Sequence, residues 1–445
     1  MENPVSQKRR GCIYMDQQLK DLYALFLEHP VISTDSRRIQ PGSLFFALRG
    51  DAFDGNEFAR QALEAGAAYA VVDDARQAVN KSYILVDDVL STMQALSRHH
   101  RLQFSIPVVA ITGTNGKTTT KELIYSVLSK KYHVLATKGN LNNHIGVPLT
   151  LLRLTGETEL AIIEMGANHP GEIDFLCNIA QPNYGLITNI GKAHLEGFGS
   201  YDGVVRTKTE LYRFIGAHGG KIFMNNEDPV LTNHSTGLTA ITYGSAQAGL
   251  AAMNLSADPF VTVDLLPAGC AGYRIESKLY GLYNAGNILA AACIGHHFNV
   301  AAEAIKSAIE EYQPGNNRSQ ITKTRHNLLI LDAYNANPSS MSAAIETFAS
   351  SDYPEKTVIL GDMLELGKES DLEHQAILDR INDLHFHHVY LVGPIFTRLN
   401  SKLENTCFQD SELAKMWFEH HKTENATILI KGSRGIRLEI LAGEL

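Results

Sequence analysis

The sequence predicts an α/β protein of three domains, with wound parallel sheets in the second and third. Three observations support this class. The 445 residues are about three times the ~150 residues of a typical domain. Short apolar runs alternate with segments of helical spacing, which is the pattern of parallel strands joined by helices. A glycine-rich turn follows one of the apolar runs and opens a helix, as in sheets that bind nucleotides.

The bulk composition is that of a globular enzyme. Hydrophobic residues make up 44% of the chain and charged residues 20%. The 39 basic and 48 acidic residues give a net charge of −9, which argues against a general nucleic-acid or anionic-membrane binder. Nucleotide substrates stay possible, since a few local cations and helix N-termini can hold phosphates in an acidic protein.

Cysteine usage and the N-terminus indicate a reducing, cytoplasmic location. The five cysteines form no CxxC pair, so neither a disulfide framework nor a zinc site is expected. No apolar run reaches the ~18 residues of a membrane helix. Lys8, Arg9 and Arg10 lack a following apolar segment, so no secretion signal is predicted. We expect residues 1–14 to be a flexible polar extension, with Met15 as an alternative start.

Residues 1–105 are expected to form a small first domain. Apolar runs predict strands at 44–48, 69–72 and 83–86, and residues 58–65 have helical spacing.

Residues 106–314 are expected to form the second domain. The run at 108–111 is continuously apolar, as a central parallel strand should be, and the helix after the glycine turn keeps its apolar residues on one face. Further buried strands are predicted at 160–163, 184–187 and 222–224.

Residues 315–445 are expected to form the third domain, because the turn residues at 313–317 mark a boundary. The alternation of strands and helices restarts after it. Strands are predicted at 328–331, 358–360, 389–392 and 428–430.

A phosphate-binding loop is the strongest local signal. Residues 113–119 read Gly-Thr-Asn-Gly-Lys-Thr-Thr between a buried strand and a helix. Glycines let backbone N–H groups close on phosphate oxygens, Lys117 can reach the terminal phosphates, and Thr118 can ligate Mg²⁺. The general form of the loop has a glycine where this chain has Ile111. A switch GTPase would also carry an N-K-x-D motif, which is absent; a kinase stays open.

Three more polar residues follow in this domain. Glu164 ends a buried strand, where ligands gather in open α/β sheets, and a carboxylate there can hold the Mg²⁺ of a nucleotide. His194 lies just past another strand end, although imidazole is an uncommon Mg²⁺ ligand. Lys208, judged by its neighbours alone, is a helix lysine paired with nearby acids.

Together these segments resemble the Mur ligase family. The resemblance is carried by Gly113–Thr120, Glu164–Gly166, Asn189–His194 and Lys208–Tyr212. Other segments resemble the branch of the family that adds a D-alanyl-D-alanine dipeptide. These are Gly139–Pro148, Asp332–Pro338, Gly361–Gly367 and Lys431–Arg434. The similarity covers essentially the whole chain from Met15.

The resemblance implies an ATP-dependent ligase of peptidoglycan precursor synthesis. It would join D-alanyl-D-alanine to UDP-N-acetylmuramoyl-tripeptide through an acyl phosphate, as a cytoplasmic monomer. The domains would be a small α/β domain for the UDP-linked substrate, a central ATPase-like parallel-sheet domain, and a Rossmann-like domain that closes on ATP and binds the dipeptide. Alternatives are the Mur ligase that adds the third amino acid, a folylpolyglutamate synthase-like ligase, and a regulator with an inactive site. The third residue of the tripeptide, meso-diaminopimelate or L-lysine, stays open.

The resemblance also implies roles for particular residues. The catalytic set would be Lys117, His194, Lys208 and Arg318. ATP would contact Gly113, Thr114, Asn115, Gly116, Lys117, Thr118, Thr119, Asn284, Asn287, Arg318 and Asp332. Two Mg²⁺ ions would be held by Thr118, Glu164, His194 and Lys208, with Lys208 carried as a carbamate. Substrates would contact Ser33, Asp35, Ser36, Arg37, Asn140, Asn143, Tyr334, Asn335 and Asn337.

The chain departs from the family pattern at Tyr283, which stands where many relatives have a histidine that stacks on the base. Asn284 and Asn287 have an alternative role as capping residues at the N-terminus of the following helix. Asp54, Gly55, Asn56 and Phe58 also resemble the uridine-nucleotide site.

Overall fold

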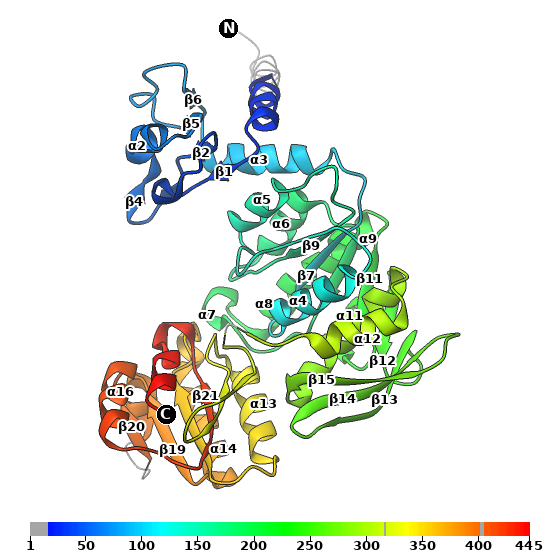
Figure 1. The fold of residues 1–445 in the computed structure, drawn as a ribbon, viewed down its shortest axis with the longest axis vertical. Helices are drawn as coiled ribbons and strands as arrows, with labels where there is room; N and C mark the ends of the chain where they lie inside the picture. The colour runs from blue at the N-terminus through cyan, green and yellow to red at the C-terminus, as the bar shows by residue number, and fades with distance from the viewer. Residues whose placement is uncertain (1–16, 316, 401–404) are drawn as a thin grey trace. The chain divides into compact units, whose positions relative to one another are not determined.

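The computed structural model describes residues 17–315, 317–400 and 405–445. The expected extension at 1–14 and the alternative start at Met15 lie outside these residues. The chain divides into two compact units. The first comprises residues up to 110 with 133–165 and 174–183, and the second comprises 111–132, 166–173 and 184–445. The α/β class is confirmed: three main sheets follow one another along the chain, each with parallel strands (Figure 1).

In the first unit, a four-stranded parallel sheet has the order β1-β2-β5-β6. Its strands are β1 (Ile32–Ser33), β2 (Leu44–Phe46), β5 (Tyr69–Val72) and β6 (Tyr83–Leu85), beside a small ribbon of β3 (Arg49–Gly50) and β4 (Phe53–Asp54). A helix over residues 17–28 and α3 (Val89–Arg101) pack their apolar faces on this sheet. The helix expected at 58–65 is present as η2 (Gly55–Phe58) followed by α2 (Ala59–Glu64).

The central sheet has nine strands in the order β15-β14-β13-β12-β11-β10-β7-β9-β8. The expected strands are present as β7 (Val108–Thr112), β9 (Leu160–Glu164), β10 (Tyr184–Ile187) and β11 (Lys221–Asn225), and β8 (Val134–Ala136) pairs with β9 in parallel. The helices of this region are α4 (Lys117–Leu128), α5 (Gly146–Leu151), α6 (Glu172–Ala180), α7 (Leu195–Phe198), α8 (Tyr201–Lys208), α9 (Glu210–Ala217), α10 (Pro229–His234), α11 (Ala285–His297) and α12 (Ala302–Glu311). Within the second unit, α11 packs against α4, the helix that the phosphate loop opens.

An antiparallel extension of this sheet was not predicted. It consists of β13 (Leu250–Ala257), β14 (Phe260–Pro267) and β15 (Tyr273–Tyr280), and β12 (Thr239–Gly244) joins it to β11. Buried and half-exposed residues alternate along β14, because one face of the extension packs inward and the other does not. Such strands lack the continuous apolar runs that identify central parallel strands.

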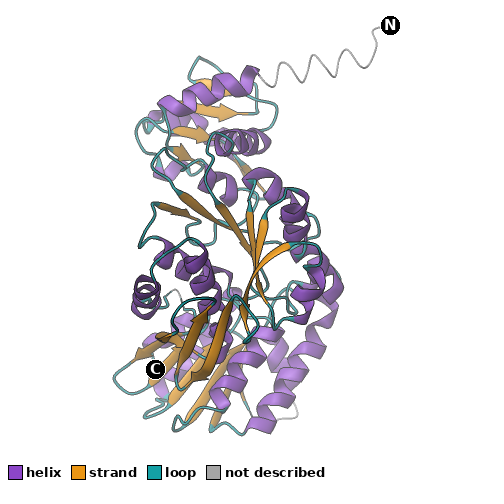
Figure 2. Cartoon of the chain, turned by 90° about the vertical axis from the view of Figure 1, so that its right-hand side faces the viewer, coloured by secondary structure: helices purple, strands orange, loops and turns teal. Residues whose placement is uncertain are grey.

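The third sheet has the order β16-β17-β21-β18-β19-β20, parallel except for β16. Its strands are β16 (Gln320–Lys323), β17 (Leu328–Leu331), β18 (Lys356–Gly361), β19 (His388–Val392), β20 (Thr406–Phe408) and β21 (Thr427–Lys431). One face packs on α16 (Ser411–His420) and η7 (Leu438–Gly443). The remaining helices are α13 (Pro338–Ala349), α14 (Ser370–Leu384) and α15 (Pro394–Leu399). Figure 2 distinguishes the helices, strands and loops of the chain by colour.

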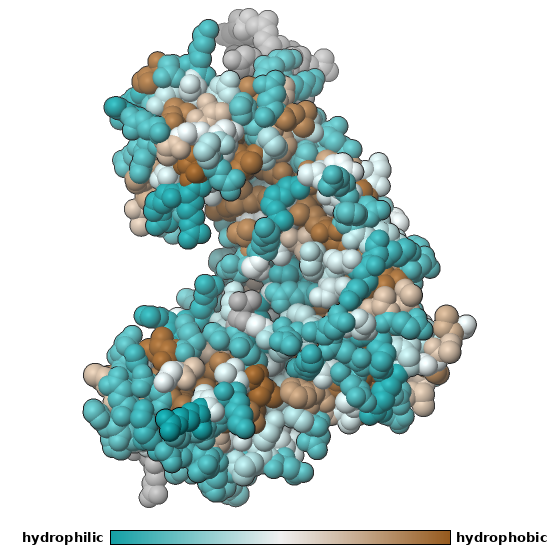
Figure 3. Space-filling model, in the orientation of Figure 1, coloured by the Kyte–Doolittle hydropathy of each residue, from teal (hydrophilic) through white to brown (hydrophobic). Residues whose placement is uncertain are grey.

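Side chains on the surface are mainly polar. Hydrophilic residues dominate the face seen in Figure 3, with apolar residues between them. Among the described residues, no helix is both long enough and apolar enough to span a bilayer.

Candidate active site

The phosphate loop follows β7 and owes its shape to two glycines. Gly113 has φ +142°, and a Cβ there would lie 2.0 Å from Thr188 Oγ1. Gly116 has φ +77°, and a Cβ there would lie 2.5 Å from Asn287 Oδ1. Only glycine suits both positions, because each combines a left-handed backbone with a close neighbour. The two glycines therefore let the loop pass close to Thr188 and to Asn287.

A second segment, residues 188–191 after β10, holds this loop in place. Asn115 N donates to Asn189 Oδ1 at 3.0 Å, and Asn189 Nδ2 returns a bond to Asn115 O at 3.0 Å. Thr188 Oγ1 donates to the same carbonyl at 2.6 Å. Thr114 is joined to Gly191 by two further bonds. Residues 189–191 of the motif that resembles the Mur ligases therefore hold the phosphate loop in place through hydrogen bonds.

Lys117 is the first residue of α4 and spans the loop. Its Nζ donates to Gly113 O at 2.8 Å and to Thr114 O at 3.0 Å. Thr118 and Thr119 are buried in the first turn of the same helix. The ammonium group and the helix dipole both favour an anion at this end of α4.

Glu164, in the first unit, is the last residue of β9 and is only 1% exposed. Its Oε1 accepts a bond from Asn142 Nδ2 at 2.8 Å, and its backbone N donates to Thr137 Oγ1 at 3.0 Å. Asn142 was not singled out from the sequence, although it lies between Asn140 and Asn143, which were. Asn140 is exposed, and Asn143 Oδ1 accepts from Gly146 N at the start of α5.

Glu164 and Thr118, each taken by itself, are donors of the type that magnesium on a nucleotide accepts. In the part of the chain that the structure describes, no three His, Cys, Asp or Glu side chains gather as a protein-only metal site requires. Magnesium on nucleotide phosphates needs only one or two protein oxygens. A buried carboxylate at Glu164 and a hydroxyl at Thr118 supply that type of donor.

His194 and Lys192 contact the third sheet region. His194 precedes α7 with φ +50°, and its Nδ1 forms an ion pair with Glu365 Oε2. The hydrogen bond from His194 lowers the pKa of Glu365. Lys192 Nζ lies 2.5 Å from Glu373 Oε1, and Lys192 N donates to Ser339 Oγ at 2.9 Å.

Lys208 is the last residue of α8 and is only 2% exposed. Its Nζ lies 3.5 Å from Ala167 O and 5.4 Å from the centroid of the Phe198 ring. Burial, together with the charge of Lys117, lowers the pKa of Lys208 well below its ordinary value, against the pull of Glu172 and Glu210. The exposed helix lysine paired with nearby acids, which the neighbours of Lys208 alone suggest, is therefore wrong, because the side chain is buried.

Asn284 and Asn287 are buried in one hydrogen-bonded chain. Asn287 Oδ1 accepts from Thr120 Oγ1 at 2.9 Å, and Asn287 Nδ2 donates to Asn284 Oδ1 at 2.8 Å. Asn284 Nδ2 donates to Tyr280 O at 2.8 Å and to Ser319 Oγ at 3.3 Å. Asn284 makes no side-chain capping bond to α11, so the alternative role at the helix N-terminus is wrong for it.

Asp332 follows β17 and is held from two sides. Its Oδ1 accepts from Ser319 N at 3.1 Å, and its Oδ2 lies 2.5 Å from Lys431 Nζ. Lys431 ends β21, next to β17 in the sheet, and is 2% exposed. Sequence analysis identified Lys431 only as part of a family motif. Its position at the end of the apolar strand 428–430 could have indicated that its side chain is buried.

Arg318, Tyr334 and Asn337 all belong to the second unit, whereas Asn335 is exposed. The guanidinium Cζ of Arg318 lies 3.6 Å from the centroid of the Tyr334 ring. Asn337 begins α13 with a capping box and donates from Nδ2 to Asn115 Oδ1 at 2.8 Å. Asn337 therefore links α13 to the phosphate loop.

The residues expected to contact the UDP group lie at the start of the first unit. Ser33 ends β1, and Asp35 caps η1 (Ser36–Arg38). Arg37 binds the Asp35 carboxylate through Nε and Nη2 at 2.8 and 2.9 Å, which lowers the pKa of Asp35 to about 2. Arg37 is 84% exposed, so its guanidinium stays accessible.

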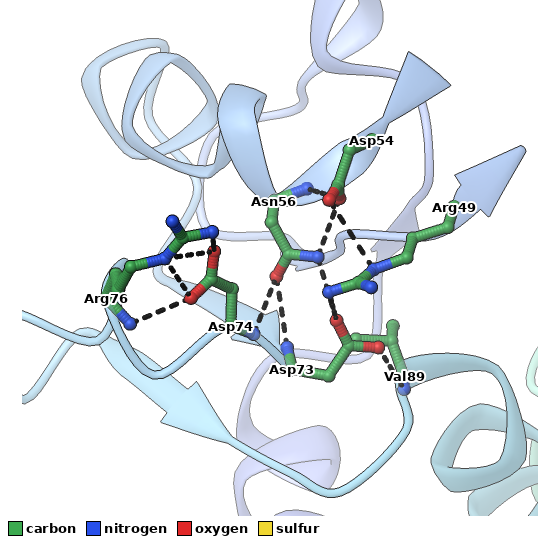
Figure 4. A network of polar contacts seen from close by, with 7 residues as sticks. All are labelled: Arg49, Asp54, Asn56, Asp73, Asp74, Arg76 and Val89. Atoms are coloured by element: carbon green, nitrogen blue, oxygen red, sulfur yellow. Dashed lines mark hydrogen bonds and ion pairs between the residues drawn. The ribbon is translucent and has the colours of Figure 1, made fainter. Parts of the chain in front are cut away.

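The neighbouring segment around Asn56 forms the scaffold of this domain (Figure 4). Asn56 Nδ2 donates to Asp54 Oδ1 at 2.7 Å and to Asp73 Oδ1 at 2.8 Å, while Asn56 Oδ1 accepts from the backbone of Asp73 and Asp74. Arg49 pairs with Asp73 at 2.8 Å. Because Asn56 is buried and its amide fully engaged, it ties two loops together; a contact with the uridine nucleotide stays a prediction for the segment.

Three family models match consecutive parts of the chain. They are described as the Mur ligase family catalytic domain at residues 30–102, the Mur ligase middle domain at 111–295, and the Mur ligase glutamate ligase domain at 317–434. The chain belongs to the Mur ligase family. This membership excludes the kinase that the phosphate loop alone left open.

Curated relatives extend over nearly the whole chain. The chain is 34% identical to UDP-N-acetylmuramoyl-tripeptide–D-alanyl-D-alanine ligase of Bacillus subtilis, over 93% of this chain and 92% of that protein. It is 33% identical to the enzyme of the same name from Escherichia coli, over 92% of each.

Solved structures agree with these relatives. A crystal structure of MurF from Acinetobacter baumannii matches with a TM-score of 0.84 and 31% identity, over 93% of this chain and 92% of that one. The MurF ligase of Thermotoga maritima, in complex with ADP, matches with a TM-score of 0.82 and 25% identity, over 93% and 96%. A folylpolyglutamate synthase, at 14% identity, shares the fold alone.

Proposed function

We propose that this Mur ligase joins the amine of D-alanyl-D-alanine to the terminal carboxylate of UDP-N-acetylmuramoyl-tripeptide, with hydrolysis of ATP to ADP and phosphate. The observation that carries the proposal is the phosphate loop of residues 113–119, which the 188–191 segment holds in place. Relatives named as D-alanyl-D-alanine-adding ligases match this chain over more than nine tenths of its length. The reaction belongs to the synthesis of the peptidoglycan precursor.

In the first step, the tripeptide carboxylate attacks the γ-phosphorus of ATP, forming the acyl phosphate and releasing ADP. We assign to Lys117 and the loop amides the binding of the phosphates, and to Arg318 the γ-phosphoryl group. Catalysis at this step is positioning and neutralisation of charge. Asn284, Asn287 and Asp332 are assigned to the nucleoside.

Magnesium bound at this site would neutralise phosphate charge. Thr118 and Glu164 are assigned to one ion, and His194 and Lys208 to a second. Lys208 supports this assignment through its burial, which favours the neutral amine. A neutral amine adds to CO₂, and loss of a proton then leaves an anionic carbamate, which offers hard oxygen ligands.

In the second step, the free amine of the dipeptide attacks the acyl carbon, and the tetrahedral intermediate expels phosphate. Water must be kept from the acyl phosphate, so a closed site is expected around it. Tyr334, Asn335 and Asn337 are assigned to the dipeptide, and Ser33, Asp35, Ser36, Arg37, Asn140 and Asn143 to the UDP-linked substrate. We place the monomeric enzyme in the cytoplasm, where ATP and UDP-linked precursors occur.

The test is phosphate release from ATP in the presence of UDP-N-acetylmuramoyl-tripeptide, with and without D-alanyl-D-alanine. We expect sustained release only with both substrates, together with a UDP-linked pentapeptide detected by mass spectrometry. Release with a single free amino acid in place of the dipeptide, and none with the dipeptide, would instead support the ligase that adds the third residue.

A further inference from the structure

Arg434 is a cation with no assigned task. It follows Lys431, Gly432 and Ser433 at the carboxyl end of the third sheet, and its side chain is exposed. Its Nη1 lies 3.4 Å from Tyr334 Oη. Among the described residues, no carboxylate forms an ion pair with its guanidinium group. The positive charge is therefore available to a ligand.

The backbone that carries Arg434 is fixed. Ser433 is buried, and its Oγ accepts from Leu364 N at 2.9 Å and donates to Ala336 O at 3.3 Å. Ser433 N donates to Asp362 O at 3.2 Å. Two other family segments, those containing Ala336 and Leu364, thus hold the residue before Arg434. A preorganised cation binds its ligand with less loss of entropy than a mobile one.

Arg434 shares the Tyr334 ring with Arg318. The Cζ atoms of Arg318 and Arg434 lie 3.6 and 5.4 Å from the ring centroid, so they are at most about 9 Å apart, the sum of the two distances. Neither guanidinium has a carboxylate partner among the residues described. Two cations on one ring repel each other, and two anions at this place would relieve that repulsion.

We propose that Arg434 binds the terminal carboxylate of the incoming D-alanyl-D-alanine. The inference rests on the proposed function, in which Arg318 is assigned to the γ-phosphoryl group. The dipeptide is then the remaining substrate of the third domain, and its one anionic group is the carboxylate. Guanidinium matches a carboxylate through two parallel hydrogen bonds.

The length of the dipeptide agrees with this arrangement. Two extended residues span at most about 7 Å. When the carboxylate of the dipeptide is bound by Arg434, its amine can therefore reach an acyl phosphate whose phosphoryl group lies near Arg318. Both arginines contact the ring of Tyr334. Tyr334 acts as a spacer between the two anions.

The test compares D-alanyl-D-alanine with D-alanyl-D-alaninamide, which lacks the negative charge. We expect the wild-type enzyme to lose about tenfold or more in kcat/KM with the amide. Arg434→Met should lose a similar factor with the acid and discriminate little between acid and amide, while the KM values for ATP and the UDP-linked tripeptide stay within about twofold. Arg434→Lys should keep part of the discrimination, because it keeps the charge without the planar fork.

The control is Arg380→Met, which removes an exposed arginine of α14 paired with Glu346 at 3.2 Å. It should leave acid–amide discrimination unchanged. A wild-type enzyme that uses the amide as well as the acid overturns the proposal without touching the proposed function. Arg434→Met that still prefers the acid overturns it too, as does a rise in the KM for ATP alone. A wild-type enzyme that does not ligate the dipeptide at all overturns the proposed function itself.

Discussion

Replacing Lys431 by methionine should strongly destabilise the third sheet region. Lys431 is 2% exposed, and its Nζ lies 2.5 Å from Asp332 Oδ2, a side chain that is itself 15% exposed. Methionine keeps the apolar stem in its place at the end of β21 but removes the charge. Asp332 then keeps one hydrogen bond, from Ser319 N, and its mostly buried carboxylate is left without a cation.

The expected loss in the free energy of unfolding is about 3–5 kcal/mol, the usual cost of removing one partner of a buried ion pair. This is a large part of the ~5–15 kcal/mol that stabilises a typical domain. Changing both partners, as Lys431→Met with Asp332→Asn, should cost less than Lys431→Met alone, because no charge is left unpaired. Since Asp332 is assigned to the nucleoside, the single variant should also raise the KM for ATP.

Urea unfolding followed by tryptophan fluorescence measures this region selectively. Trp417 is the one tryptophan of the chain and packs on the apolar core of the third sheet. The matched control is Lys422→Met. Lys422 is 53% exposed and 3.8 Å from Glu444, so its loss should cost less than about 1 kcal/mol. A cost for Lys431→Met no greater than for this control, or a double variant less stable than the single one, would refute the reasoning.

Three further predictions concern the loop lysine, the buried lysine and a buried histidine. Lys117→Ala should abolish turnover with an unchanged urea midpoint; a lowered midpoint would mean a structural role. Lys208→Ala should slow turnover about 10²-fold or more, with partial rescue by acetate; undiminished activity contradicts the carbamate. Burial lowers the pKa of His374 below the ordinary value of 6.5, so the folded state binds a proton at this residue less readily than the unfolded state. The stability contributed by the neutral His374 is therefore present above pH 6.5 and is lost as the pH falls. His374→Gln, whose Oε1 can still accept from Met363 N, should flatten that dependence between pH 7 and 5; an unchanged slope of urea midpoint against pH contradicts this.

The fold was predictable where strands are buried on both faces. The runs at 184–187 and 328–331 coincide with β10 and β17, because a central parallel strand must be apolar throughout. The extension β13–β15 and the edge strand β16 were missed. Their residues alternate in burial or are half-exposed, and such short patterns cannot be told from loops by apolar runs alone.

The site was predictable where its chemistry is local in sequence. The phosphate loop needs two glycines, a lysine and a threonine within seven residues, so its spacing is visible. Three residues of the site were missed individually, namely Lys431, Asn142 and Ser319. Their hydrogen-bond partners are 99, 22 and 35 positions away in the sequence, respectively. Only the folded sheet brings such pairs together. Sequence also could not show that Lys208 is buried, since its neighbours include acids that would pair with it in water.

The polar chain through the second unit joins the residues assigned to the nucleoside to the third sheet. It runs through Thr120, Asn287, Asn284, Ser319, Asp332 and Lys431. Asn284 Nδ2 donates both to Tyr280 O, at the end of β15, and to the Ser319 hydroxyl. A movement of Ser319 away from Asn284 removes one of these two acceptors from a buried amide, at a cost of about 1–3 kcal/mol. A base that accepts from the same amide offsets that cost. Binding of the base and movement of the segment at Ser319 therefore both depend on Asn284 Nδ2. By linkage, binding of the base must shift the position of the Ser319 segment, and a shift of that segment must change the affinity for the base.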